Sequence, residues 1–207
     1  SAAIIKGNYI GTSTGSNDLG NGSNGIYIGS GVTSTTIGGT DVGTTNVISG
    51  NTGNGIYVDG SDGIVIEKNY IGVSSAGTAA LANGASGILL ASGSNTIGGT
   101  TSSSINIISG NTLSGIRIDG TINNASSNII KYNKIGTNAL GTAAIANGGD
   151  GILVVTGGTA TGLIIGGTDQ GNLISGNTGN GIHIAATGAT GAQIYDNTIG
   201  LQADDST

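Results

Sequence analysis

The sequence predicts an all-β solenoid, a parallel β-helix of short strands, and three observations lead to this prediction. An Asn-x-Ile motif returns along the whole chain, and a Gly-apolar-x-apolar motif returns with the same mean interval of about 31 residues. Gly, Asn, Ser and Thr fill the segments between them. Such repetition is typical of proteins in which each unit stacks on the next. We expect one coil per repeat, and therefore about six to seven coils.

The Asn-x-Ile motif supplies one strand of every coil. Its isoleucine is expected to point inward and to stack on the equivalent isoleucine of the coils above and below. Asparagine tolerates left-handed backbone angles, and its amide can both donate and accept along the stack. The series is Asn8-Tyr9-Ile10, Asn46-Val47-Ile48, Asn69-Tyr70-Ile71, Asn106-Ile107-Ile108, Asn133-Lys134-Ile135, Asn172-Leu173-Ile174 and Asn197-Thr198-Ile199.

The Gly-apolar-x-apolar motif supplies the first strand of each coil. Alternation places its two apolar residues inside and the residue between them outside. The series is Gly25 to Ile28, Gly55 to Val58, Gly87 to Leu90, Gly115 to Ile118, Gly151 to Val154 and Gly181 to Ile184. A further strand, such as Ile64-Val65-Ile66, lies between the two motifs. Three strands per coil predict three parallel sheets, whereas the abundance of Gly and β-branched residues disfavours helices.

Two coils together form a longer unit of about 64 residues. The spacing from the Asn-x-Ile isoleucine to the next first-strand isoleucine alternates between short and long along the chain. Every second coil therefore carries a long excursion at the same corner. Two excursions are nearly identical, Gly77 to Gly84 and Gly141 to Gly148.

Composition excludes several classes of protein. The chain has 43 Gly but no Pro, Cys, Met, Trp or Phe, so its core must be narrow and evenly filled by Ile, Val, Leu and Ala. A net charge of −6 with five basic residues argues against a nucleic-acid partner. No apolar run approaches the length of a membrane span, so we expect no membrane insertion.

We interpret residues 1–207 as a single solenoid domain and as an uncapped segment of a larger protein. The chain begins at Ser1 rather than Met, and Ser1 to Ile5 runs directly into a strand. Uncapped coils expose unpaired strand edges and an apolar cross-section. The isolated fragment is therefore expected to associate end to end.

The recurring corner asparagine resembles the asparagine ladder of pectate-lyase-like β-helices. The elements Ile48 to Asn51 and Asn54 to Ile56 look like the repeats of large bacterial surface proteins of the adhesin type. The resemblance covers nearly the whole chain. It implies a right-handed single-stranded parallel β-helix and an extracellular or cell-surface location in bacteria. It indicates little about activity, because the repeat occurs in both enzymes and adhesins.

The candidate binding site is the outward face of the first strands. Aromatic rings with neighbouring Asp and Arg can hold a sugar by stacking and hydrogen bonding. Long excursions beside this sheet would give it a shallow groove, and in the enzymes that the chain resembles this face carries the catalytic groups. The candidate ligand-binding residues are Tyr27, Tyr57, Asp59, Arg117, Asp119 and His183.

The acidic residues do not form a catalytic pattern, and we assign no catalytic residue. Asp59 and Asp119 are two rungs apart, about 10 Å, whereas a hydrolytic pair requires roughly 5–9.5 Å. The motifs Gly38 to Asp41 and Gly166 to Asp169 resemble calcium-binding Gly-Asp repeats but lack their nine-residue period. Asp41 and Asp169 are thus the only calcium candidates, and no other cofactor is indicated.

The sequence favours a structural or adhesive segment of a bacterial cell-surface or secreted protein, able to bind carbohydrate along the first sheet. The alternative is a polysaccharide-active lyase, hydrolase or epimerase that uses the same face. More remote alternatives are a phage tail fibre and ice binding. Ice binding requires an uninterrupted Thr ladder, and Ile164 interrupts the column of Thr36 and Thr96.

Overall fold

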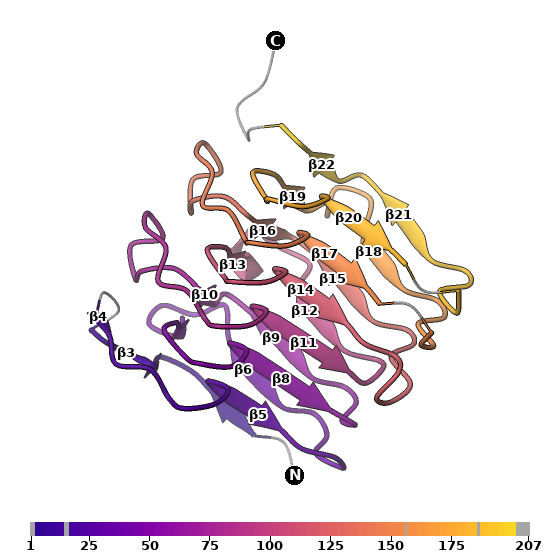
Figure 1. The fold of residues 1–207 in the computed structure, drawn as a ribbon, viewed down its shortest axis with the longest axis horizontal. Coiled ribbons are helices and arrows are strands. Elements are labelled where there is room, and N and C mark those ends of the chain that lie inside the picture. The colour runs from indigo at the N-terminus through magenta and orange to yellow at the C-terminus, as the bar shows by residue number, and fades with distance from the viewer. Residues whose placement is uncertain (1–2, 15–16, 156, 186, 202–207) are drawn as a thin grey trace.

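The chain is wound into a rod of stacked coils, with the first described coil at one end of the rod and the last described coil at the other (Figure 1). The computed structural model describes residues 3–14, 17–155, 157–185 and 187–201. Nearly all regular structure in these ranges is short parallel strand, apart from a single 3-10 turn at Ser102–Ser104. No helix in these ranges is long and apolar enough to cross a membrane. The predicted parallel β-helix is confirmed.

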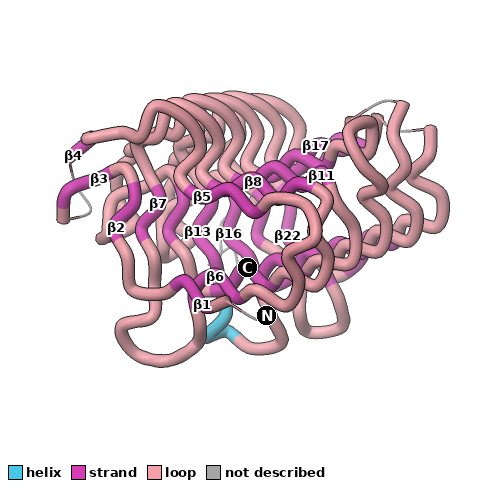
Figure 2. Tube along the Cα trace, turned by 90° about the horizontal axis from the view of Figure 1, so that it is seen from below, coloured by secondary structure: helices cyan, strands magenta, loops and turns pink. Residues whose placement is uncertain are grey.

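Three parallel sheets run along the rod, and each coil contributes one strand to each sheet (Figure 2). The first sheet contains β5 (Ile26–Ile28), β8 (Ile56–Asp59), β11 (Ile88–Ala91), β14 (Ile116–Ile118), β17 (Ile152–Val154) and β20 (Ile182–Ile184). The second sheet contains β1 (Ile4–Ile5), β6 (Thr36–Gly38), β9 (Val65–Glu67), β12 (Thr96–Gly98), β15 (Ile129–Lys131), β18 (Ile164–Gly166) and β21 (Gln193–Tyr195).

The third sheet is formed by the Asn-x-Ile motifs. It contains β2 (Tyr9–Ile10), β7 (Val47–Ile48), β10 (Tyr70–Ile71), β13 (Asn106–Ile108), β16 (Asn133–Ile135), β19 (Leu173–Ile174) and β22 (Thr198–Ile199). Its isoleucines pair in register from Ile10 to Ile199, as predicted. The side chains in the middle coils, such as Ile71 and Ile108, are fully buried. This column is one wall of a core that runs the length of the rod.

The predicted asparagine ladder is confirmed. Each amide donates to the oxygen of the next, from Asn8 on Asn46 at 2.9 Å to Asn172 on Asn197 at 2.8 Å. In the middle, Asn69 donates to Asn106 at 3.0 Å, and Asn106 donates to Asn133 at 2.9 Å. The ladder satisfies buried amides at a corner where the chain turns between the second and third sheets.

A second asparagine ladder, which the sequence analysis missed, lies at the corner between the third and first sheets. Its members are Asn21, Asn51, Asn83, Asn111, Asn147 and Asn177. Asn51 and Asn111 stand three residues after their strands, whereas Asn21, Asn83 and Asn147 belong to the three long excursions. The excursions are therefore fastened to the stack by the same amide hydrogen bonds as the short corners.

The last two of the three long excursions contact each other across two coils. β3 (Thr12–Ser13) and β4 (Asn17–Asp18) form the first as a small antiparallel hairpin. In the other two, bridges join Val73 to Ala80 and Thr137 to Ala144. The amide of Ala139 donates to the carbonyl of Gly77 at 2.9 Å, which links these two excursions. A side chain at Gly77 would meet Ala139 at 2.6 Å, and its φ of +65° also favours glycine.

Candidate functional site

The outward residues of the first sheet lie in register, one per rung. The column runs Tyr27, Tyr57, Leu89, Arg117, Leu153 and His183. Two leucines therefore divide the polar residues into three groups along the rod. The first and third groups have partners that are distant in the sequence, whereas the partners of the second group are local.

The first group joins two tyrosine rings to an aspartate. The rings of Tyr27 and Tyr57 are 5.3 Å apart between centroids and meet edge to face. The hydroxyl of Tyr27 donates to Asp59 at 2.7 Å, and the amide of Asn123 donates to the other oxygen of Asp59 at 2.9 Å. Tyr27 is 55% exposed, so part of its ring is open to a ligand. The sequence analysis missed Asn123, which lies in a loop two coils further along.

The two phenols of this group stay protonated at neutral pH. The hydrogen bond to Asp59 raises the pKa of Tyr27, and burial together with the charge of Asp59 raises the pKa of Tyr57. Both hydroxyls are therefore neutral groups that can donate and accept hydrogen bonds.

The second group pairs a buried aspartate with a more exposed arginine. The guanidinium of Arg117 donates to Asp119 at 2.8 Å, and the amide of Thr121 donates to the other carboxylate oxygen at 3.1 Å. Burial alone would raise the pKa of Asp119, but hydrogen bonds from Thr121 and Arg117 lower it below its ordinary value. The side chain of Asp119 is 6% exposed and that of Arg117 is 37% exposed. Arg117 is thus the member of this pair that a ligand can reach.

The third group pairs His183 with Asp150. The Nδ1 atom of His183 lies 3.1 Å from Asp150, whose other oxygen accepts from the backbone and side-chain amides of Asn180 at 2.7 and 2.8 Å. Burial raises the pKa of Asp150, but the Asn180 and His183 contacts outweigh it and lower the pKa. Asp150 ends the last long excursion, and the sequence analysis did not connect it with His183.

These groups do not merge into one acid–base cluster. The rung of Leu89 separates the tyrosines from Arg117, and the rung of Leu153 separates Arg117 from His183. Residues two rungs apart are about 10 Å apart along the rod. Within the described ranges, the ion pairs are Arg117–Asp119 and His183–Asp150, and the two pairs share no residue.

The two calcium candidates lie in turns that precede the third sheet. The carbonyl of Asp41 accepts from the ammonium of Lys68 at 2.7 Å, so a positive charge already lies against this turn. Asp169 has a φ of +56° and lines a cavity with Asp196. Among the described residues, no group of three or more His, Cys, Asp or Glu side chains could hold a metal ion. Calcium binding at Asp41 or Asp169 stays a prediction.

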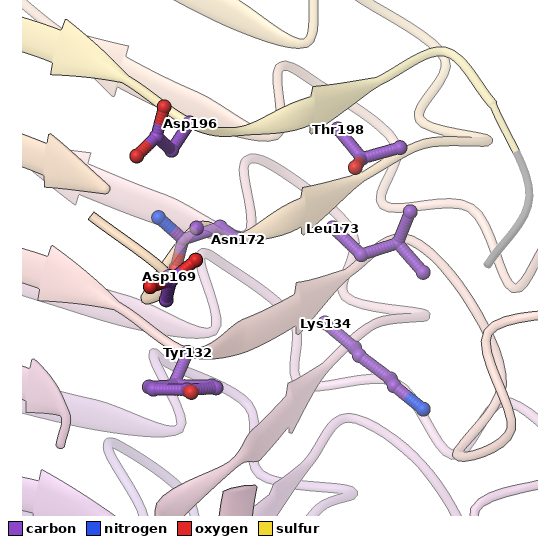
Figure 3. Close-up of a pocket in the computed structure, with 8 residues that line it drawn as sticks. Tyr132, Lys134, Asp169, Asn172, Leu173, Asp196 and Thr198 are labelled. Carbon is purple, nitrogen blue, oxygen red and sulfur yellow. The ribbon is translucent and has the colours of Figure 1, made fainter. Parts of the chain in front are cut away.

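Cavities open over the second and third sheets. One of 610 Å³ lies over the second sheet between Glu67, whose pKa is raised by burial, and Lys131. Another of 460 Å³ lies over the third sheet and is lined by Tyr132, Lys134 and Asp169 (Figure 3). A shallow groove was expected over the first sheet, but none of the six candidate residues lines these two cavities or three others among the described residues.

The direction in which the long excursions project explains why the cavities do not lie over the first sheet. A side chain at Gly77 would come within 3.3 Å of the ring of Tyr70, which faces outward from the third sheet. The ammonium of Lys134, on the same sheet, donates to the carbonyl of Ala139 at 2.7 Å. The tips of both excursions therefore lie beside the third sheet.

Comparisons with known proteins give the fold. No protein-family model and no curated protein matches the chain. Among solved structures, three variants of the periplasmic alginate epimerase AlgG are similar. Two single-substitution variants have TM-scores of 0.64 and 0.60 over 96% of this chain, and a double variant has 0.60 over 86%, each at 20% identity. The chain spans 37% to 40% of their length, and at this identity the similarity establishes a shared parallel β-helix.

Proposed function

We propose that this chain is a structural segment of a bacterial cell-surface or secreted protein and that it binds a neutral polysaccharide on the first sheet. The observation that carries the proposal is the exposed ring of Tyr27 against the partly buried ring of Tyr57, beside Asp59 and Asn123. A partly exposed ring offers an apolar face for a sugar ring, and the surrounding hydroxyl, carboxylate and amide groups match sugar hydroxyls.

Charge favours a neutral ligand over an acidic one. The chain carries a net charge of −6, and the tyrosine group contains Asp59. Its nearest outward basic residue, Arg117, is two rungs from Tyr57 and already bound to Asp119. A polyuronate would therefore meet repulsion at the tyrosine pair.

The shared fold supports a connection with polysaccharides. The AlgG structures are of a periplasmic alginate epimerase, a protein that acts on a polysaccharide outside the cytoplasm. We extend to this chain the class of ligand and the extracytoplasmic location. The epimerase activity is not extended, because acids and bases do not converge on the first sheet.

The test is affinity electrophoresis with soluble neutral and acidic polysaccharides. We expect retardation by at least one neutral polysaccharide and at least a tenfold weaker affinity in the double variant Tyr27→Ala/Tyr57→Ala. Tyr195→Ala is the matched control, because Tyr195 is a similarly exposed tyrosine on the second sheet. Equal affinity of the double variant and the control would contradict the proposal.

The second candidate function is a polysaccharide-active enzyme, and the pairing of His183 with Asp150 favours it. A carboxylate that orients a histidine is an arrangement used in general-base catalysis, and Arg117 lies two rungs away in the same column. The assay measures unsaturated products and epimerised residues from pectate and alginate, with and without calcium. We expect no turnover. Product formation that is lost in both His183→Gln and Arg117→Ala would establish the enzyme instead.

A further inference from the structure

Three of the cavities lie in a line over the outer face of the third sheet. Their volumes are 300, 250 and 460 Å³. The first two share Tyr70 and Thr45, and the second and third share Lys134. Because neighbouring cavities share lining residues, they form a row of adjoining cavities parallel to the axis of the rod. The side chain of Lys134, bound to the carbonyl of Ala139, lies between the second and the third. We call this row the third-sheet groove.

The floor of the third-sheet groove is the outward column of that sheet. In register, the column is Tyr9, Val47, Tyr70, Ile107, Lys134, Leu173 and Thr198. Val47 and Ile107 face outward, and their exposed fractions are only 4% and 3%. Seven rungs give a length on the order of 29 Å.

One wall borders all three cavities, and a second wall borders only the first two. The first consists of the turns that precede the asparagine ladder, with hydroxyl groups at Thr45, Ser102 and Ser103. In Figure 3, Tyr132, Asp169 and Asp196 form this wall beside the floor residues Lys134, Leu173 and Thr198. The other wall consists of the excursion tips, represented by Ser75 and Ala139.

The floor alternates between buried aliphatic residues and longer polar ones. Tyr9 is 56% exposed and Tyr70 is partly exposed, and they are two rungs apart, about 10 Å. This spacing is comparable to the length of a disaccharide unit. An extended sugar chain along the axis would place two of its rings, one disaccharide unit apart, on Tyr9 and Tyr70.

The charges of the groove are mixed. The ammonium of Lys134, whose pKa is lowered by burial, donates to Ala139, and that of Lys68 donates to the carbonyls of Thr40 and Asp41. Asp169 and Asp196 stand at the far end. With both signs present, the groove suits an uncharged chain rich in hydroxyl groups.

We infer that the third-sheet groove binds an extended neutral polysaccharide chain parallel to the rod, with Tyr9 and Tyr70 as its stacking platforms. This site goes beyond the proposed function, because it lies on another face and shares no residue with the tyrosine pair of the first sheet. The walls and the seven-rung floor suit a chain rather than a single sugar.

The experiment titrates the protein with neutral oligosaccharides of increasing length, drawn from the polysaccharides that retard it in electrophoresis or, if none does, from cellulose, mannan and xylan. The heat of binding, measured by isothermal titration calorimetry, is the signal, because it does not depend on the tyrosines that the variants remove. We expect affinity to rise with length up to the length of the groove and to fall at least tenfold in Tyr9→Ala/Tyr70→Ala. Tyr70→Phe, which keeps the ring, should stay within about twofold of the wild type. Urea unfolding verifies that each variant is folded.

The two sites are separated by comparing their variants. Loss of affinity only in Tyr9→Ala/Tyr70→Ala supports the groove and contradicts the first-sheet proposal. Loss only in Tyr27→Ala/Tyr57→Ala does the reverse. Affinity that is independent of chain length and unchanged in Tyr9→Ala/Tyr70→Ala overturns the groove, and so does exclusive binding of an acidic polymer such as polygalacturonate.

Discussion

The inner and outer columns of the solenoid follow opposite rules. Inside, the third sheet repeats isoleucine in every coil, and in the middle coils these side chains have no exposed surface. Outside, the first sheet changes from Tyr57 to Leu89 to Arg117 over three successive rungs. An inward residue packs on the equivalent residues of the coils above and below. A residue type that fills this space in one coil therefore fills it in every coil. An outward residue is free to vary, and the candidate sites lie among these varied residues.

Substitution in the asparagine ladder should give the largest loss of stability. Asn106→Ala removes the acceptor of the backbone and side-chain amides of Asn69, together with the donors to Asn133 and Ile66. Since each unsatisfied buried group costs about 1–3 kcal/mol, we expect a total loss of about 3–6 kcal/mol in urea unfolding. Asn8→Ala, at the exposed end of the ladder, should cost less than about 1 kcal/mol. Equal losses for the two variants would show that the ladder does not act through burial.

The isoleucine column should give the next largest effect. Ile108→Ala should lower the free energy of unfolding by about 2–5 kcal/mol, because it removes fully buried methyl groups and leaves a cavity. Ile199, in the same column, is 46% exposed in the last described coil, so Ile199→Ala should cost well under half as much. Thermal or urea unfolding of both variants measures the difference between middle and terminal coils.

Asp119 should link stability to pH. The pKa of its carboxyl group is lowered in the folded state from an ordinary value of 3.8. Its stabilising effect is therefore complete above about pH 4 and is lost as the pH falls further, through the folded pKa. Asp119→Asn should lower the free energy of unfolding by about 1–3 kcal/mol near pH 7. The difference in free energy of unfolding between this variant and the wild type should become smaller below about pH 4. If the difference in free energy of unfolding between wild type and Asp119→Asn stayed constant in acid, the charge of Asp119 would not be what stabilises the fold.

The sequence alone predicted the fold well because inward residues repeat at fixed offsets. Asn106 stands two residues before Ile108, as Asn133 does before Ile135, so the first ladder and its sheet could be recognised directly. The second ladder was hidden. Asn51 follows Ile48 by three residues, whereas Asn83 follows its strand only after a long excursion, and a variable offset leaves no period to detect.

The candidate sites were less predictable because their partners come from loops. Register could align Tyr27 with Tyr57, but it could not show that Asn123 reaches Asp59 across 64 residues. Nor could it show that Asp150 meets His183, since loop paths follow no period. The third-sheet groove depends on the direction in which the excursions lean, which is set by contacts such as that of Ala139 with Gly77.

Urea unfolding of two neighbouring substitutions on β11 tests the difference between inner and outer columns most directly. Ile88 is fully buried and Leu89, the next residue, faces outward and is only partly buried. Ile88→Thr places a hydroxyl in the core and should cost about 2–4 kcal/mol, whereas Leu89→Thr should cost less than about 1 kcal/mol. Losses of equal size, or a larger loss at Leu89, would contradict the division of this molecule into an inner surface that sets the fold and an outer surface free for binding.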